Sequence, residues 1–340
     1  MAKVVTMGEI LLRLSTKDYR KFIQANEFEA CFGGSEANVA VSLAMFGIES
    51  AYVTKVPDNP IGKSAISSLK KLNVDTSNVL YGGDRLGLYY MEKGSAVRPS
   101  SVVYDRAGSS MSAAEASDFD FDKIFDGADW FHFSGITPAI SEQARIVTLE
   151  AVKAAKRKGL TVSCDLNYRK KLWTIEEARQ VMPQYMEYVD VLMGGREDAR
   201  KMLGFTLSKE NEDDTPNLEA YEKMFQEMVE KYHFKYVISS LRQSHTSSYH
   251  DFSGCIYDGK NFHAAKKYEI SPMVDRVGGG DAFAAGNIFA ILSGKETKDV
   301  IEFSVAASAL KHTIPGDANL ATVEEIEHLM KGNGIGRVQR

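Results

Sequence analysis

The chain has 340 residues, of which 44% are hydrophobic and 26% are charged, and its formal net charge is -5. This composition is that of an ordinary globular protein, and the length suits one large α/β domain or two smaller ones. Lysines and arginines are spread along the chain instead of forming a basic stripe, so we do not expect nucleic acid as a partner.

Secretion and membrane insertion are not expected either. Residues 1–9 lack the long apolar run of a signal peptide, and no later stretch reaches the roughly 18 apolar residues that a membrane span needs. Cys31, Cys164 and Cys255 are far apart and odd in number, which predicts reduced thiols. We therefore expect a cytoplasmic protein.

Short apolar runs predict strands at 4–7, 51–56, 130–133, 161–165, 189–193 and 236–239. Amphipathic stretches between most of them predict helices, and the clearest helix begins at Ser141 and continues to Lys158, before Gly159. This alternation predicts an α/β fold with a parallel sheet covered by helices.

Two segments, at about 11–32 and 86–108, do not fit that alternation. They are rich in alternating aromatic and polar residues, and successive side chains such as Tyr89 and Tyr90 would point to opposite faces of a strand. We predict that they form a small β-sheet that projects from the main sheet as a lid. Because exposed apolar surface often becomes a subunit contact, we expect a homo-oligomer formed through this lid.

Residues 275–286 (DRVGGGDAFAAG) carry the strongest local signal for chemistry. Gly278, Gly279 and Gly280 free backbone N–H groups at the start of a predicted helix, where unpaired amides and partial positive charge favour a phosphoryl group. Asp281, beside them, could accept the proton of an attacking hydroxyl. The alternative is that Asp281 only caps the helix and the glycines form a tight turn.

Two other nucleotide motifs fail in this sequence. The GKS tripeptide at 62–64 resembles the end of a P-loop, but Pro57 stands where the first glycine should be. A dinucleotide GxGxxG that began at Gly278 would need glycine at Phe283. A hydride-transfer enzyme therefore loses its main support.

Two further segments could contact a ligand. In 32–38 (FGGSEAN), paired glycines allow close approach to the backbone, and Asn38 offers a donor and an acceptor. The alternative there is a simple turn into a helix capped by Ser35. In 164–169 (CDLNYR), alternation would place Asp165, Asn167 and Arg169 on one side at a strand end, where open α/β sheets bind ligands.

Taken together, these segments resemble the ribokinase-like (PfkB) carbohydrate kinases. The similarity runs from residues 8–9 through GGSEAN and DLNYR to 311–313, and its most specific part is DRVGGGDAFAAG, where the family usually has DTxGAGD. The resemblance implies a single domain over residues 1–340 with a three-layer α/β/α fold, a central mainly parallel sheet and a β-lid. The implied reaction is ATP-dependent phosphorylation of a sugar, and within the family the match is to kinases of 2-keto-3-deoxygluconate.

The resemblance also assigns roles by position. Asp281 would be the catalytic base, and the backbone from Val277 through the glycines Gly278, Gly279 and Gly280 would form the anion hole. Sugar contacts are implied at Gly34, Asn38, Tyr89, Tyr104, Arg106, Arg169 and Asp281, and Asn167 joins them through its place in the polar row. Nucleotide contacts are implied at Ser240, Arg242, Gly278, Gly280 and Ala307.

Arginine chemistry favours an acid sugar as the substrate. Arg106 and Arg169 fall within the two sugar-side segments, and a guanidinium group can bind a carboxylate with two hydrogen bonds. The alternative is that both arginines form surface ion pairs. We expect a sugar acid, and a fructokinase or ribokinase is the nearest rival.

The implied cofactors are ATP and Mg²⁺. The family's NxxE motif for magnesium is altered here, because Gly195 replaces the Asn and Asp198 replaces the Glu. Since Mg²⁺ keeps several waters in most protein sites, Asp198 is expected to hold it through water. The altered motif also leaves open a non-catalytic sugar sensor. In some relatives the position of Asp275 helps to bind a monovalent cation, and the resemblance leaves this open for the present chain.

Overall fold

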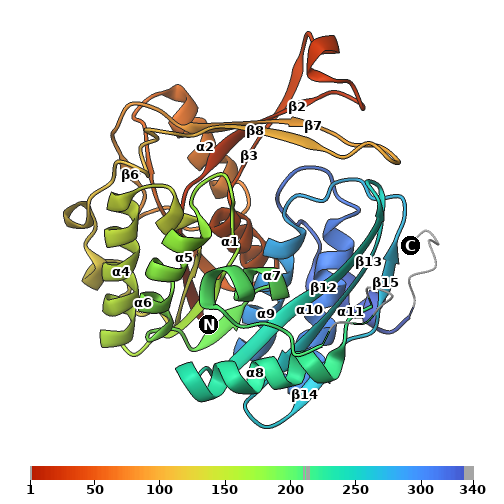
Figure 1. Cartoon of the computed structure of the whole chain (residues 1–340). Coiled ribbons are helices and arrows are strands. Elements are labelled where there is room, and N and C mark those ends of the chain that lie inside the picture. The colour runs from red at the N-terminus through yellow and green to blue at the C-terminus, as the bar shows by residue number, and fades with distance from the viewer. Residues whose placement is uncertain (1, 210, 212–214, 333–340) are drawn as a thin grey trace.

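The computed structural model describes residues 2–209, 211 and 215–332, and these form a large sheet between helices and a small sheet that projects from it (Figure 1). The strands are β1 (Lys3–Met7), β2 (Leu11–Thr16), β3 (Phe28–Gly33), β4 (Glu49–Val53), β5 (Lys55–Val56), β6 (Leu80–Tyr81), β7 (Gly87–Glu92), β8 (Ser101–Asp105), β9 (Trp130–Ser134), β10 (Thr161–Asp165), β11 (Val191–Met193), β12 (Tyr236–Thr246), β13 (Tyr249–Tyr257), β14 (Phe262–Ala264) and β15 (Tyr268–Ile270). The helices are α1 (Ser35–Met45), α2 (Pro60–Lys70), α3 (Phe121–Ile124), α4 (Glu142–Arg157), α5 (Ile175–Val181), α6 (Pro183–Met186), α7 (Arg196–Asp198), α8 (Leu218–Tyr232), α9 (Gly279–Leu292), α10 (Thr297–Lys311) and α11 (Val323–Met330).

The large sheet has the strand order β14-β13-β12-β11-β10-β9-β1-β4, and β15 also pairs with β13. Neighbours from β4 to β12 are parallel, whereas β13 is antiparallel to β12, β14 and β15. The expected central, mainly parallel sheet is confirmed. The strand expected at 51–56 divides into β4 and β5, because β5 leaves the large sheet and pairs with β6.

Helices cover both faces of this sheet, which explains why its strands are apolar on both sides. Val4 and Val5 are neighbours in β1, yet they lie in different hydrophobic clusters. Val5 shares its cluster with Val147 of α4, and Val4 shares its own with Ile288 of α9. The helix expected to start at Ser141 is α4: the Ser141 Oγ accepts from the Ala144 amide at 3.0 Å and caps it.

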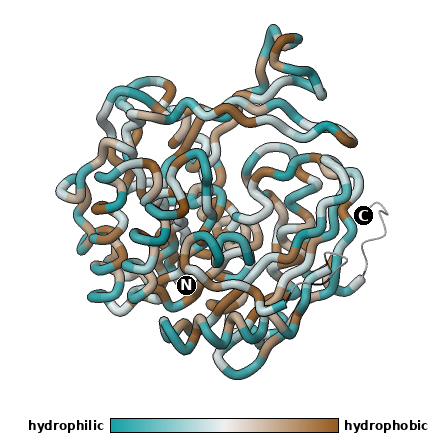
Figure 2. Tube along the Cα trace, viewed as in Figure 1, coloured by the Kyte–Doolittle hydropathy of each residue, from teal (hydrophilic) through white to brown (hydrophobic). Residues whose placement is uncertain are grey.

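The small sheet has the strand order β3-β2-β7-β8 and is built from both segments that the sequence predicts for a lid. The expected lid sheet is confirmed. Its register aligns Arg13, Tyr89 and Tyr104 on the face toward the large sheet, and Tyr90 on the opposite face. The arms of the lid extend beyond the main body (Figures 1 and 2).

Two smaller expectations can be compared with the described part of the chain. No helix there is both long and apolar enough to cross a membrane. Cys31, Cys164 and Cys255 are free thiols, as predicted. The assignment of all 340 residues to one domain stays a prediction, since residues 1, 210, 212–214 and 333–340 lie outside the described part.

Candidate active site

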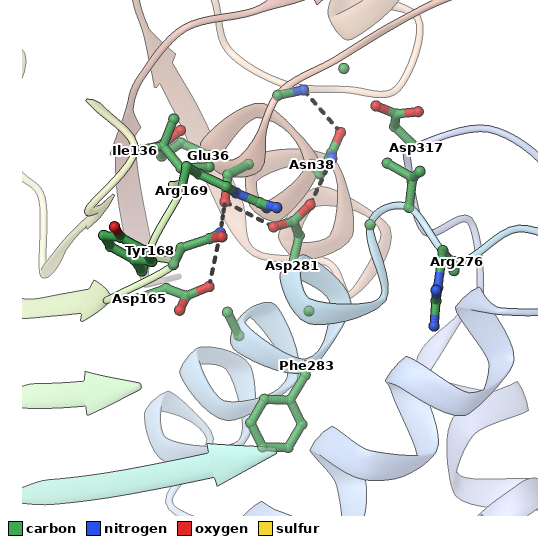
Figure 3. A pocket seen from close by; sticks show the side chains of 18 of the residues that line it. Glu36, Asn38, Ile136, Asp165, Tyr168, Arg169, Arg276, Asp281, Phe283 and Asp317 are labelled. Atoms are coloured by element: carbon green, nitrogen blue, oxygen red, sulfur yellow. Dashed lines mark hydrogen bonds between the residues drawn. The ribbon is translucent and has the colours of Figure 1, made fainter. Parts of the chain in front are cut away.

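A cavity of about 590 Å³ lies between the lid and the carboxyl ends of the central strands. Segments that are distant in sequence meet there, including the starts of α1 and α9 and the chain that follows β10 (Figure 3). Most of the residues that sequence analysis singles out line this cavity: Gly34, Asn38, Tyr89, Tyr104, Arg106, Asn167, Arg169, Asp198, Ser240, Arg242, Gly278, Gly280 and Asp281.

Two expected site residues do not line the cavity. Gly279 is buried, and a Cβ placed on it would meet the ring of His312. Ala307 lies in α10, fully buried among the core residues that pack between α9 and α10, so the structure does not place it where a nucleotide could contact it. The position of Ala307 in the sequence does not reveal which face of α10 packs into the core.

Asp281 is the third residue of α9, and its carboxylate faces α1 instead of its own helix (Figure 3). Its Oδ1 accepts from the Ser35 hydroxyl at 2.8 Å, and its Oδ2 accepts from the Asn38 amide at 2.7 Å. The helix caps assumed in both simpler interpretations are therefore wrong: Gly278, and not Asp281, is the N-cap of α9. Gly34, and not Ser35, is the N-cap of α1.

The electrostatics of Asp281 suit a proton acceptor. Burial raises its pKa, while the hydrogen bonds from Asn38 and Ser35 and the positive charge of Arg169 oppose that rise. A carboxylate with a raised pKa takes up a proton more readily than an ordinary surface aspartate. Two fixed hydrogen bonds also hold its oxygens in one orientation at the cavity wall.

The glycine run forms a turn with free amides beside Asp281. Gly278 has a φ of 81°, and a Cβ there would lie 1.8 Å from the Asp317 carbonyl oxygen, so only glycine fits. Within the described residues, no hydrogen bond occupies the amides of Gly279, Gly280 and Asp281. A Cβ on Gly280 would meet open space, which leaves room for a ligand. The Val277 amide is not available, because it donates to Asp275 Oδ1 at 3.1 Å.

Three arginines that line the cavity, Arg169, Arg242 and Arg276, have no carboxylate partner among the described residues. Desolvation, followed by the positive charges of Arg276 and Arg169, lowers the pKa of Arg242 to about 10, although its side chain keeps exposed surface. Guanidinium groups that repel one another around one cavity are favourable only with an anionic ligand. Arg276 lies inside the glycine motif, but nothing in its spacing indicated this role.

Arg106 behaves differently from those three. Its Nε donates to Glu9 Oε2 at 2.7 Å, and its Nη2 contacts the same oxygen. Both side chains are nearly buried, so this is an ion pair of the cavity wall and not of the surface. The charge of Arg106 is already neutralised, whereas Arg169 has no ion-pair partner among the described residues.

Asp165, Asn167 and Arg169 reach the cavity, but not through the alternation of side chains along a strand that the sequence predicts. β10 ends at Asp165, and Asn167 has a left-handed φ of 41° that turns the chain. The Asn167 amide lies 3.3 Å from the Ser35 hydroxyl and 3.4 Å from Asp165 Oδ2. Asp165, Asn167 and Arg169 all line the cavity, but a turn places them there.

The acidic residues fit a weakly held magnesium ion. Asp198 accepts from the amides of Tyr168 and Gly195 at 3.2 and 3.3 Å. Burial, and then the negative charges of Asp198 and Asp281, raise the pKa of Asp165 well above its ordinary value, and a divalent cation would relieve this repulsion. In the described part of the chain no three acidic, His or Cys side chains form a ready metal cluster. One or two carboxylates are what Mg²⁺ takes when phosphates and water complete its shell.

A buried charge network lies behind the glycine turn. Arg13 of the lid donates to Asp275 Oδ2 at 2.8 Å and to Asp317 Oδ1 at 2.7 Å. The Tyr89 hydroxyl donates to Asp317 Oδ2 at 2.6 Å. The network thus ties lid strands β2 and β7 to the turn, and sequence analysis missed Asp317, which follows α10 without any recognisable motif.

Fold and site together place a buried carboxylate beside a turn with free amides, below a lid on an α/β body. The model of the pfkB family of carbohydrate kinases matches residues 1–323. This chain belongs to the PfkB family of carbohydrate kinases.

Individual relatives extend that assignment. A crystal structure of 2-dehydro-3-deoxygluconokinase from Thermotoga maritima is 47% identical, covers 98% of this chain and 100% of its own, and has a TM-score of 0.94. The 2-dehydro-3-deoxygalactonokinase of Haloferax volcanii is 32% identical over 98% of each chain. An E. coli structure described as a putative ribokinase II in complex with ATP and Mg²⁺ shares the fold, with a TM-score of 0.82 at 20% identity over 98% of this chain and 100% of its own.

Proposed function

We propose that this kinase transfers the γ-phosphoryl group of ATP to the terminal hydroxyl of 2-keto-3-deoxygluconate, giving the 6-phospho sugar acid. The observation that carries the proposal is the convergence of the Asp281 carboxylate and the free amide of Gly280 at one cavity wall. The unpaired Arg169 supports a substrate with a carboxylate, and so does the likeness to the Thermotoga maritima enzyme. The galactonate epimer is the second candidate, because the Haloferax volcanii relative is named for it.

The residues of this chain divide the work of the transfer. Asp281, oriented by Ser35 and Asn38, accepts the proton of the sugar hydroxyl. The amides at the start of α9 hold the phosphoryl oxygens as charge accumulates on them. Bound Mg²⁺, held through water by Asp198 with Asp165 beside it, would supply further neutralisation of phosphate charge. Ser240 and Arg242, at the cavity wall on β12, would contact the nucleotide.

Neutral sugars provide the sharpest contrast for the substrate. Fructose and ribose lack the carboxylate that Arg169 would bind, so they should be poorer acceptors than 2-keto-3-deoxygluconate. A coupled assay of ADP release over these sugars and the galactonate epimer measures kcat/KM for each. A higher kcat/KM for fructose or ribose would overturn the sugar-acid assignment, and no release with any sugar would favour a sensor.

The role of Asp281 is tested by Asp281→Asn. We expect kcat to fall about 10³-fold, because general-base catalysis is lost, while the KM for ATP changes little. Asp299→Asn, an exposed aspartate on α10, is the matched control and should retain full turnover. An Asp281→Asn variant within tenfold of the wild-type kcat would contradict the assignment.

We also propose that the lid joins two copies of this chain. Phe28, Val103 and Tyr90 lie on its outer face, and Phe28 and Val103 are 41% and 50% exposed. Burying such apolar side chains against a second lid would remove them from water. Sedimentation equilibrium of wild type and Val103→Asp measures this: a wild-type monomer would refute the contact, and dissociation of only the variant would support it.

A further inference from the structure

Lys311, the last residue of α10, is a fully buried lysine that the proposed mechanism does not use. Its Nζ donates to the Ile314 carbonyl oxygen at 3.0 Å. The side chain runs beneath the glycine turn, since a Cβ placed on Gly278 would come within 3.1 Å of the Lys311 Cε. A buried ammonium group needs compensating charge nearby, or the protein would favour its neutral form.

That compensation comes from the network behind the turn. Burial lowers the pKa of Lys311, and the negative charges of Asp275 and Asp317 act against this. Arg13 is bonded to the same two carboxylates. Two buried acids therefore face two buried bases, and the network is neutral only when Lys311 carries its proton.

On the cavity side, the negative charge of Asp281 acts on Lys311 in the same direction as Asp275 and Asp317. The titratable groups on the other sides of the network do not alter this balance. Cys31 lies 3.8 Å from Asp317, and burial and then Asp317 raise the pKa of its thiol to about 12. Burial lowers the pKa of His312 to about 3, so its ring is neutral near pH 7. The Tyr89 hydroxyl keeps its proton, donates a hydrogen bond to Asp317 and is neutral as well.

The site suggested for a monovalent cation does not fit such an ion. Asp275 Oδ2 already accepts from Arg13 and from the Gly316 amide at 3.2 Å, and its Oδ1 accepts from Val277. Protein cations and amides thus occupy both oxygens. An added cation would bring excess positive charge into a network that is already balanced.

We propose that Lys311 is a positioning residue whose ammonium group acts as a built-in cation under the glycine turn, so that the enzyme needs no added monovalent cation. This inference rests on the proposed phosphoryl transfer. Without Lys311 the network would hold a net negative charge directly behind the amides that must bind phosphate. In a poorly solvated site that charge weakens anion binding most when the phosphoryl group is being transferred.

The test replaces Lys311 with a neutral side chain of similar length, Lys311→Met. Lys298→Met, an exposed lysine of the same helix, is the control. Activity and thermal unfolding are measured in potassium chloride, ammonium chloride and choline chloride at equal ionic strength. Choline, with three methyl groups on its nitrogen, is too large for the space that the ammonium group leaves beside the Ile314 carbonyl oxygen.

We expect wild type and Lys298→Met to have the same kcat in all three salts. Lys311→Met should lose kcat roughly tenfold or more in choline, with a smaller change in the KM for ATP, and should regain most of it in potassium or ammonium. Its Tm should rise with potassium relative to choline, whereas the wild-type Tm should not.

Several outcomes would overturn the inference. A wild-type kcat that rises more than about twofold with potassium over choline would do so whether or not the variant folds. So would a Lys311→Met variant with wild-type kcat in choline, or one with equal losses in all salts, since either result means that Lys311 only closes the end of α10. Wild type that phosphorylates no sugar would refute the proposed function instead, and the Tm series would still decide whether the variant gains a cation site.

Discussion

Two sets of arginines lie at the cavity or directly behind its wall, and their surroundings differ. Arg13 and Arg106 are almost fully buried and each is bonded to carboxylates. Arg169, Arg242 and Arg276 have no acidic partner among the described residues. The first set holds the lid and the glycine turn in place. The second set has no hydrogen-bonded carboxylate among the described residues, so its charge is available to an anionic ligand. The paired arginines and the unpaired arginines should therefore respond differently to the same substitution.

The largest effect is expected on stability, at the paired arginines. Arg13→Met would leave Asp275 and Asp317 buried with one cation fewer, which costs about 3–5 kcal/mol of unfolding free energy. Arg242→Met, the same change at an unpaired arginine, should alter stability by no more than about 1 kcal/mol. Guanidinium denaturation measures both. Equal losses in the two variants would remove the distinction between the sets.

The next largest effect is expected on substrate use, at the unpaired arginines. Arg169→Met should lower kcat/KM for the sugar acid about 100-fold, because a charged hydrogen-bonded pair with the carboxylate is lost. Any neutral sugar that the enzyme accepts should be affected far less. Lys170→Met, the exposed neighbour, is the control in the same steady-state assay. A similar loss for acid and neutral sugars would show that Arg169 does not bind the carboxylate.

The smallest effect concerns pH. Since burial raises the pKa of Asp281, kcat/KM should fall on acidification through an apparent pKa above the usual aspartate value of about 3.9. Arg169 opposes that rise, so Arg169→Met should shift the acid limb to higher pH, by roughly one unit or less. In Arg242→Met, the acid limb of the kcat/KM profile should stay at the same pH as in wild type. An acid limb that moves to lower pH in Arg169→Met would contradict the assignment of Asp281 as the base.

Ionisation of Asp281 has opposite effects on folding stability and on the proposed activity. The raised pKa of Asp281 means that its ionised form is disfavoured in the folded protein, so its contribution to stability is greatest below the ordinary pKa and is lost as pH rises through the folded value. The proposed reaction needs the ionised form. The site therefore holds Asp281 in a state that costs stability.

Much of the site could be predicted because its residues lie in short motifs at fixed places in an α/β fold. Asp281 and Gly280 begin a helix, and Asn167 and Arg169 follow a parallel strand, so the carboxyl edge of the sheet brings them together. Ala307 could not be placed, because helix orientation depends on packing. The antiparallel strands β13, β14 and β15 were also missed, since an edge hairpin lacks the alternation with helices that marks the rest.

By itself, the sequence determined most of the alternation of strands and helices, the lid segments and the place of Asp281 beside the glycine turn, since periodicity and local backbone chemistry act over a few residues. Only the tertiary structure decided which charges are neutralised. Arg13 meets Asp275 and Asp317 across 262 and 304 positions of the chain, and Arg106 meets Glu9 across 97. The sequence shows the same positive charge for every arginine. Whether the fold brings a carboxylate within hydrogen-bonding distance determines whether that charge stabilises the protein or stays available to a ligand.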